Sequence, residues 1–271
     1  MLPTTVIFFR ESLEASLIVG ILIAYLARIG RSDRVRSIWL GVGAAVATDF
    51  LVAIATFRLI TDYDGSPLQT IFEGCTYLVA TGILTYMSFW MKGQSHGLKR
   101  ELEAQVNAAL SRGSMAAIVL LSAITVGREG LETAFFTLAI AFNSSPGALA
   151  AGATLGLLLG LAVSYWVYSL GRRVPLGLFF NVLGVLLLLF AAGLLADGIR
   201  AFQDLGWLPF LHTVVWHSES LLSEDSALGD ILHAFFGYAQ APTLLQVGAY
   251  AAFLVTSVAS YMHLGPSRRT S

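Results

Sequence analysis

Two short segments of the sequence combine one arginine with two glutamates in the same order. They are Arg10-Glu11-Ser12-Leu13-Glu14 and Arg128-Glu129-Gly130-Leu131-Glu132, which agree at four of five positions. In an α-helix, which turns about 100° per residue, the arginine and both glutamates fall within an arc of about 100°. Each segment therefore places three charges on one helix face, with its two carboxylates close to one turn apart.

Carboxylates in this pattern favour a hard metal cation. Oxygen ligands suit Mg²⁺, Ca²⁺, Mn²⁺ and iron, whereas zinc and copper sites usually include histidine or sulfur. Neither motif contains histidine, cysteine or methionine. The single cysteine, Cys75, has no second cysteine to form a disulfide or a thiolate metal site. The residues alone thus indicate a hard cation without deciding which one.

The segments around these charges are apolar. Of the 271 residues, 56% are hydrophobic and 12% are charged, against roughly 25% charged residues in an average soluble domain. A helix needs about 20 apolar residues to cross a bilayer. A search of the sequence for apolar segments of that length predicts an all-α polytopic membrane protein with seven transmembrane helices. The expected ranges are about 4–27, 38–60, 71–91, 115–142, 147–170, 175–199 and 243–264. The lipid bilayer is the expected surrounding, and a net charge of -1 gives no reason to expect nucleic acid as a partner.

The basic residues predict the orientation, because short loops rich in lysine and arginine stay in the cytoplasm. Most of the 16 lysines and arginines follow the first, third, fifth and seventh of these ranges. Acidic residues such as Asp62 and Asp64 occupy the alternate loops. We therefore expect the N-terminus outside and the C-terminus in the cytoplasm.

The two motifs are expected at the same depth in the membrane. Glu14 lies 13 residues from Ala27, and Glu129 lies 14 residues from Met115. At about 1.5 Å per residue, both are roughly 20 Å from the cytoplasmic side although their helices run in opposite directions. This predicts an inverted 3+3 repeat with a site at the repeat interface, as in many secondary transporters. The single domain, 1–271, then consists of repeat one (about 1–91), a cytoplasmic interfacial helix (about 97–111), repeat two (about 115–199), an outer loop (about 200–242) and helix seven (about 243–264).

The energetics favour a shared site for the two motifs. A charge at the centre of a transmembrane helix costs about 2.5–3.5 kcal/mol, so neither motif helix suits lipid by itself. When the motifs meet, each arginine can neutralise one glutamate, which leaves a net charge of -2 for a multivalent cation. The alternative is a pair of salt bridges that only pin the two helices together. Two such pairs would need two carboxylates rather than four, and buried ion pairs stabilise a fold weakly.

Three further patterns concern packing and loops. Gly152, Gly156 and Gly160 recur every four residues, which predicts close helix packing. Apolar residues at helical spacing between about 97 and 111 suit a helix on the cytoplasmic membrane surface. The outer loop contains three histidines that could bind metal but are ordinary loop residues in most proteins: His212, His217 and His233.

The two motifs in a chain of this length resemble the oxidase-dependent iron transporter family, which includes fungal high-affinity iron permeases and bacterial ferrous-iron permeases. The resemblance covers nearly the whole chain. Further stretches similar to the bacterial branch are Phe72-Glu73-Gly74, Phe89-Trp90-Met91, Ala191-Ala192-Gly193, Ile199-Arg200-Ala201-Phe202, Phe236-Gly237-Tyr238 and Ala241-Pro242.

The resemblance implies a transporter, not an enzyme, that imports iron across the bacterial inner membrane. Iron would be the transported substrate, with no permanently bound cofactor. The implied iron ligands are Glu11, Glu14, Glu129 and Glu132, and Arg10 and Arg128 would balance their charge. The family also implies oxidation of Fe²⁺ by a separate chain, so a periplasmic iron-oxidising or iron-delivering protein is the expected partner.

Four more residues are candidates for the pathway. Glu73 is expected near the outer end of its helix, where it could collect iron, and Tyr77 lies one turn further on the same face. Asp49 falls near the middle of a predicted span, where pairing with a polar neighbour explains it as well as a functional role does. Asp197 would line the vestibule or face water.

Two other functions use the same carboxylates. One is a divalent-cation or proton-coupled exchanger. The other is an intramembrane di-iron enzyme, which typically requires Glu-x-x-His on two of its helices. Neither motif contains that histidine, so the sequence favours a transporter.

Overall fold

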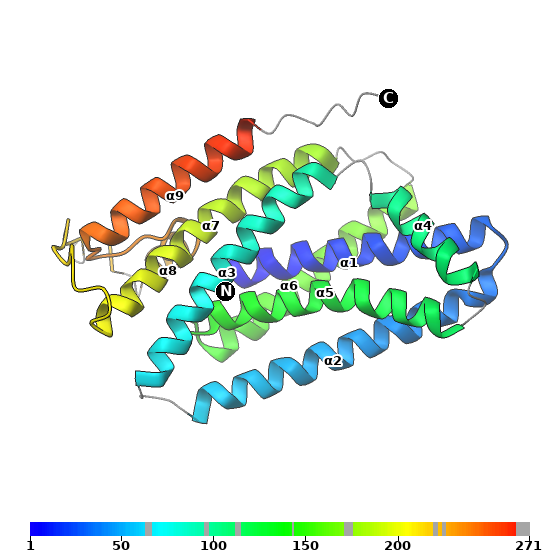
Figure 1. Ribbon diagram of the computed structural model, residues 1–271, viewed down its shortest axis with the longest axis horizontal. Helices are drawn as coiled ribbons and strands as arrows, with labels where there is room; N and C mark the ends of the chain where they lie inside the picture. The colour runs from blue at the N-terminus through cyan, green and yellow to red at the C-terminus, as the bar shows by residue number, and fades with distance from the viewer. Residues whose placement is uncertain are drawn as a thin grey trace. The chain divides into compact units, whose positions relative to one another are not determined.

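The computed structural model describes residues 1–62, 67–94, 98–111, 115–142, 144–170, 176–218, 222–223 and 226–263. Within these ranges the chain is helical, and its β-structure is a single bridge between Val214 and Thr243. The helices are α1 (Leu2–Arg28), η1 (Ser32–Arg34), α2 (Val35–Asp62), α3 (Pro67–Gln94), α4 (Leu98–Ser111), α5 (Met115–Ala141), α6 (Pro146–Leu170), α7 (Leu176–Asp204), α8 (Ala227–Phe236) and α9 (Leu244–His263) (Figure 1).

Each of the seven long ranges expected from hydrophobicity is a helix. The boundaries agree within a few residues, and the largest difference is at the end of α7, which reaches Asp204 instead of 199. The expected outer loop also contains a short helix, α8, that hydrophobicity did not indicate. Ser226 caps its N-terminus by accepting a hydrogen bond from the Gly229 N–H (3.0 Å), and Gly237 ends it in the left-handed conformation.

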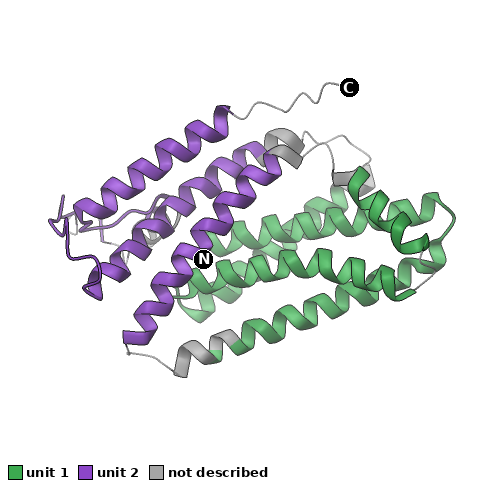
Figure 2. Ribbon diagram, in the orientation of Figure 1, with its two compact units in different colours: residues 1, 3–59, 96–174 green, residues 2, 60–95, 175–271 purple. Residues whose placement is uncertain are grey.

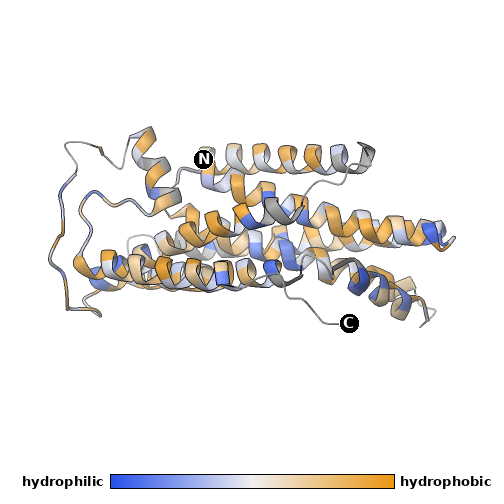
Figure 3. Cartoon of the chain, turned by 90° about the horizontal axis from the view of Figure 1, so that it is seen from above, coloured by the Kyte–Doolittle hydropathy of each residue, from blue (hydrophilic) through white to orange (hydrophobic). Residues whose placement is uncertain are grey.

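The apolar character of the long helices fits a multi-pass membrane protein. Within the described part of the chain, four segments are long and apolar enough to cross a bilayer, namely 32–55, 146–166, 181–204 and 244–263. Figure 3 shows long apolar stretches interrupted by short hydrophilic patches. Helices α1 and α5 carry the three charges of a motif near their middles, which lowers their apolar character. The count of seven spans and the side on which each terminus lies stay predictions.

The chain divides into two compact units (Figure 2). The first comprises residue 1 and residues 3–59 and 96–174, and therefore holds α1, α4, α5, α6 and most of α2. The second comprises residue 2 and residues 60–95 and 175–271, and holds α3, α7, α8 and α9. Both predicted repeats contribute helices to each unit.

In the first unit, glycines of α6 lie directly against α1, as their four-residue spacing predicted. A methyl group on Gly156 would lie 2.8 Å from Cβ of Phe8 and 2.9 Å from the backbone nitrogen of Phe9. No room for a side chain remains at that position. The neighbouring contacts of α6 with α1 join Gly152 to Thr4 and Gly160 to Ser12.

A second close packing joins α2 to α5. Its contacts pair Gly41 with Ser122, Ala45 with Gly127, and Asp49 with Gly130. Residue numbers rise together along both helices, so α2 and α5 run parallel. Because α1 turns back into α2 through a short connection, α1 and α5 run in opposite directions (Figure 1).

Helix α4 packs on the first unit with its apolar face inward. Leu102, Val106 and Ala109 are buried in one cluster with residues of α1, α2 and α5, among them Leu22 and Ile118. The Tyr25 hydroxyl donates a hydrogen bond to Oδ1 of Asn107 (2.8 Å), which joins α1 to α4. The apolar face that the sequence suggested for the membrane surface is therefore covered by protein.

In the second unit, α7 packs against α3 and α9. Gly198 lies against Cβ of Tyr77, and the Thr81 hydroxyl donates to the Ala191 carbonyl (3.2 Å). On the other side, the Gln246 amide donates to the Ala196 carbonyl (3.2 Å). These contacts fix the register of α3 and α9 along α7.

Candidate cation site

The first motif forms a compact ion cluster on α1. Nη1 of Arg10 lies 2.8 Å from Oε1 of Glu11, and Nε lies 2.8 Å from Oε1 of Glu14. The exposed fractions of these side chains are 1%, 4% and 11%. One guanidinium thus serves both glutamates of its motif, because its fork presents donors in two directions.

The second motif repeats this arrangement on α5 with looser geometry. Nη2 of Arg128 lies 2.9 Å from Oε1 of Glu129, while its Nε lies 3.7 Å from Oε1 of Glu132. Glu129 is 2% exposed and Glu132 is 13% exposed, but Arg128 is 46% exposed. The two motifs therefore differ in how deeply they bury the arginine.

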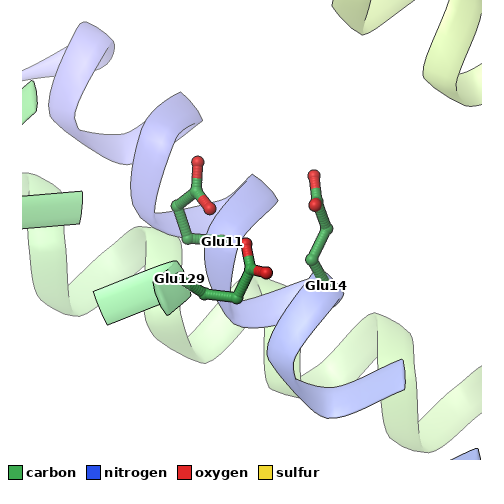
Figure 4. Close-up of side chains that lie close together, drawn as sticks. All are labelled: Glu11, Glu14 and Glu129. Atoms are coloured by element: carbon green, nitrogen blue, oxygen red, sulfur yellow. The ribbon is translucent and has the colours of Figure 1, made fainter. Parts of the chain in front are cut away.

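The carboxylates of the two helices converge. One oxygen from each of Glu11, Glu14 and Glu129 lies within 4.8 Å of the others. Figure 4 shows Glu11 and Glu14 on α1 and Glu129 on α5. The fourth glutamate, Glu132, interacts electrostatically with Glu14 and Arg10 across the two helices. The structure thus brings three of the four glutamates within 4.8 Å of one another and leaves Glu132 outside that set.

Several oxygens of this cluster accept no hydrogen bond from the described residues, although they are buried. They are Oε2 of Glu11, Glu129 and Glu132. A buried carboxylate oxygen without a partner costs free energy, so native structures rarely leave one without a ligand, ion or water. Hence the arrangement has coordination capacity that its own arginines do not use.

A cavity of about 560 Å³ in the first unit reaches this cluster. Its lining includes Glu11 and Glu129 and extends along α5 to Ala141. Twelve residues separate Glu129 from Ala141, a distance of about 18 Å along a helix. Beyond the cluster in the other direction lies the apolar cluster that α4 covers. The cavity therefore extends from the cluster toward the end of α5 that is remote from α4, and several of its lining residues, among them Phe50, Phe135 and Leu157, are exposed.

Asp49 lines the same cavity from α2. Its carboxylate lies against Gly130, the third residue of the second motif. The sequence left open whether a polar neighbour pairs with Asp49. Among the described residues no hydrogen bond or ion pair to Asp49 is found, and its close neighbour is the backbone of Gly130.

The remaining candidates lie in the second unit. The Tyr77 hydroxyl donates a hydrogen bond to Oε1 of Glu73 (2.9 Å), so the two residues on one helix face are joined. Asp197 approaches Nε2 of His233 at 3.7 Å, and Nδ1 of the same histidine lies 2.7 Å from the Tyr238 carbonyl oxygen. His212 and His217 are exposed. Within the second unit, Glu73 is thus paired with Tyr77, and Asp197 with His233.

Sequence reasoning missed the hydroxyl groups of the cavity. Ser12, Thr133 and Thr137 line it together with the glutamates. Thr133 and Thr137 follow Glu129 at intervals of four residues, which placed them on the same helix face. That spacing was the available signal, but hydroxyl groups in helices commonly bond to the preceding turn, as both threonines do here.

Comparison with known proteins adds an independent result. The model of the iron permease FTR1 family matches residues 1–263. The ferrous iron permease EfeU of Yersinia pestis is 38% identical over 258 residues, covering 93% of this chain and 90% of that protein. The protein of the same name from Escherichia coli O6:H1 is 34% identical over 259 residues, covering 94% and 93%. No solved structure matches.

Proposed function

Because the chain belongs to the iron permease FTR1 family, we propose that it imports iron across the bacterial inner membrane through the cluster of four glutamates. The observation that carries this proposal is the convergence of carboxylates from two antiparallel helices within 4.8 Å. When all four are ionised, the two arginines leave a net charge of -2, which attracts a multivalent cation. Carboxylate oxygens are hard ligands that suit iron.

The residues have distinct roles in this proposal. Glu11, Glu14, Glu129 and Glu132 bind the ion through oxygens that the arginines leave available. Arg10 and Arg128 hold the carboxylates in place and lower their mutual repulsion. A salt-bridge function alone does not account for Oε2 of Glu11 and Glu129, which accept no hydrogen bond from described residues.

The two close packings of the first unit support an inverted repeat. On α2 the contacts recur at positions 41, 45 and 49, and on α6 they recur at 152, 156 and 160. In each set the last position meets the third residue of a motif, Gly130 or Ser12. Two halves with the same internal register and opposite direction would produce this pattern, and they would place the ion site between them.

The cavity and the apolar cluster under α4 suggest a direction of transport. With the N-terminus of α1 outside, the cavity connects the glutamates to the outer side. The cluster around Leu22 then closes the cytoplasmic side. In an alternating-access cycle this is the state that receives the ion, and release would require the α4 side to open.

The proposal includes a partner and two outer residues. A separate periplasmic protein would oxidise or deliver the iron, as the family resemblance implies. Glu73, joined to Tyr77, would collect the ion in the second unit, and Asp197 would line the outer side. An increase in uptake when a purified partner is added to the outside of proteoliposomes would support this coupling.

Uptake of radioactive iron into proteoliposomes tests the central proposal. Glu129→Gln and Glu14→Gln each remove one charge with little change in size. We expect uptake near background in both, and normal uptake in Glu101→Gln, because that residue is exposed on α4. Retained uptake in either motif variant would refute the ion-binding role.

The same assay separates import of iron from exchange of other ions. Excess Mn²⁺ and Mg²⁺ are added as competitors, and the pH gradient is varied independently. Selective iron uptake supports the permease. Equal transport of the competitors with a strict dependence on the pH gradient would favour the cation or proton exchanger.

A further inference from the structure

Asp49 is a carboxylate in a helix that is otherwise apolar. It belongs to the segment 32–55, which is long and apolar enough to cross a membrane. Its neighbour Leu51 is exposed on the outside of the unit. Asp49 is partly exposed and, together with Phe50, lines the cavity that reaches Glu11 and Glu129. An ionisable residue at this depth is costly and suggests a function.

The backbone of the second motif makes room for this carboxylate. A methyl group on Gly130 would overlap the Asp49 carboxylate and lie 3.1 Å from its Cβ. In the first motif the equivalent residue is Ser12, whose side chain meets a glycine of α6, Gly160. In the first motif the glycine of the contact lies on the partner helix, α6, whereas in the second motif the glycine belongs to the motif itself. Only the contact at the second motif includes a carboxylate, Asp49, which α2 of the first half contributes.

Two other groups in the cavity point to a ligand. Glu11 and Glu129 are almost completely buried, and Oε2 of each accepts no hydrogen bond from the described residues. The cavity of about 560 Å³ is many times the roughly 30 Å³ that one water occupies in the liquid. Most of its lining is apolar, so the few side chains that carry oxygen atoms are the places where a cation could be held.

We propose that Asp49 is a fifth cation-binding carboxylate, which holds a hydrated divalent cation in the cavity before the cation passes to Glu11 and Glu129. This inference rests on the proposed function. Gly130 is the positioning residue, because its lack of a side chain lets the carboxylate lie against the second motif. Ser12 and Thr133 line the same cavity and offer oxygens to the hydration shell.

The first test is Asp49→Asn, which keeps the size of the side chain and removes its charge. We expect the KM for Fe²⁺ uptake by proteoliposomes to rise about tenfold, the effect of losing one charge-assisted contact. The maximal rate should change less than about twofold, because the four glutamates remain. Glu101→Gln on α4 is the matched control for loss of a carboxylate. An unchanged KM in Asp49→Asn overturns the proposal.

The second test keeps the aspartate at position 49 but displaces its carboxylate. Gly130→Ala introduces a methyl group into the position of the carboxylate, whereas a methyl group at Gly127 would meet only Cβ of Ala45, at 3.6 Å. We expect Gly130→Ala to raise the KM and Gly127→Ala to leave it unchanged. Equal KM values in the two variants overturn the positioning role. This pair keeps the proposal testable even where Asp49→Asn does not fold.

A binding measurement separates this proposal from the proposed function. Mn²⁺, another hard cation, is titrated into purified protein, and the loss of its free electron paramagnetic resonance signal reports binding. If wild-type protein binds no Mn²⁺ and takes up no iron, the proposed function fails together with this inference. If wild type is active, Asp49→Asn should bind Mn²⁺ about tenfold more weakly. Wild-type affinity in that variant refutes the role of Asp49 alone.

Discussion

The two motif arginines provide a quantitative test, because each pairs with the two glutamates of its own motif but with different geometry. Arg10 holds Glu11 and Glu14 at 2.8 Å each and is 1% exposed. In Arg10→Lys a single ammonium replaces the fork and can keep only one of these short contacts. Losing one buried charge-assisted bond costs about 1.5–3 kcal/mol. A protein of this size changes its melting temperature by about 2–4 °C per kcal/mol, so we expect a decrease of roughly 3–12 °C.

The matched variant is Arg128→Lys. Its guanidinium is 46% exposed, and its second contact is 3.7 Å long. An ion pair with this exposure contributes about 0–1 kcal/mol, so the melting temperature should fall by less than about 4 °C. Intrinsic tryptophan fluorescence of both purified variants in the same detergent measures the difference.

The same two variants should also transport iron more slowly, because a lysine cannot orient both carboxylates of a motif. Proteoliposome uptake measures this effect in parallel with the melting temperatures. If Arg128→Lys lowers the melting temperature as much as Arg10→Lys does, burial does not distinguish the motifs and our reasoning is wrong. Normal uptake in both variants would remove the arginines from the mechanism.

Three other substitutions test the packing and the outer residues. Gly156→Ala should lower the melting temperature, because forced contacts in a packed interface cost about 1–3 kcal/mol. Gly147→Ala is the control and should not lower it, since a methyl group there would meet nothing within 4 Å. Equal melting temperatures of the two variants would contradict the close packing of α6 on α1. Leu102→Ala should cost about 2–5 kcal/mol and expose α4 to limited proteolysis, and wild-type protease resistance would show that α4 is held by other contacts. Tyr77→Phe removes the hydrogen bond to Glu73 and should raise the KM for iron uptake with little change in the maximal rate. Uptake kinetics measure both values, and an unchanged KM would argue against collection of iron at Glu73.

Much of the secondary structure could be read from the sequence. Long apolar ranges became helices with nearly the expected ends, because a segment this hydrophobic satisfies its backbone hydrogen bonds internally. The helix α8 was missed because it is short and lies among polar residues. Its cap residues, Ser226 and Gly237, were present in the sequence but are weak signals without an apolar span.

The face of α4 shows what an amphipathic pattern leaves undecided. Leu102 and Val106 at helical spacing predicted an apolar stripe, and the structure has one. The sequence suggested that this helix lies at the cytoplasmic membrane surface, which stays a prediction, and in the structure its apolar stripe packs against α1, α2 and α5. A lipid headgroup region and a protein surface both cover apolar side chains, so periodicity cannot distinguish them.

The sequence by itself determined which charges belong together within each motif, because a helix fixes the angles between residues four positions apart. It also indicated that these charges need partners, since an apolar segment cannot carry three of them alone. The tertiary structure decided which partners meet: carboxylates of α1 and α5 within 4.8 Å, Asp49 against Gly130, and Glu73 with Tyr77 in the other unit. Glycines let these helices pack closely against one another. Which helices become neighbours depends on how well two helix surfaces fit together, and the sequence of one segment describes only one of the two surfaces.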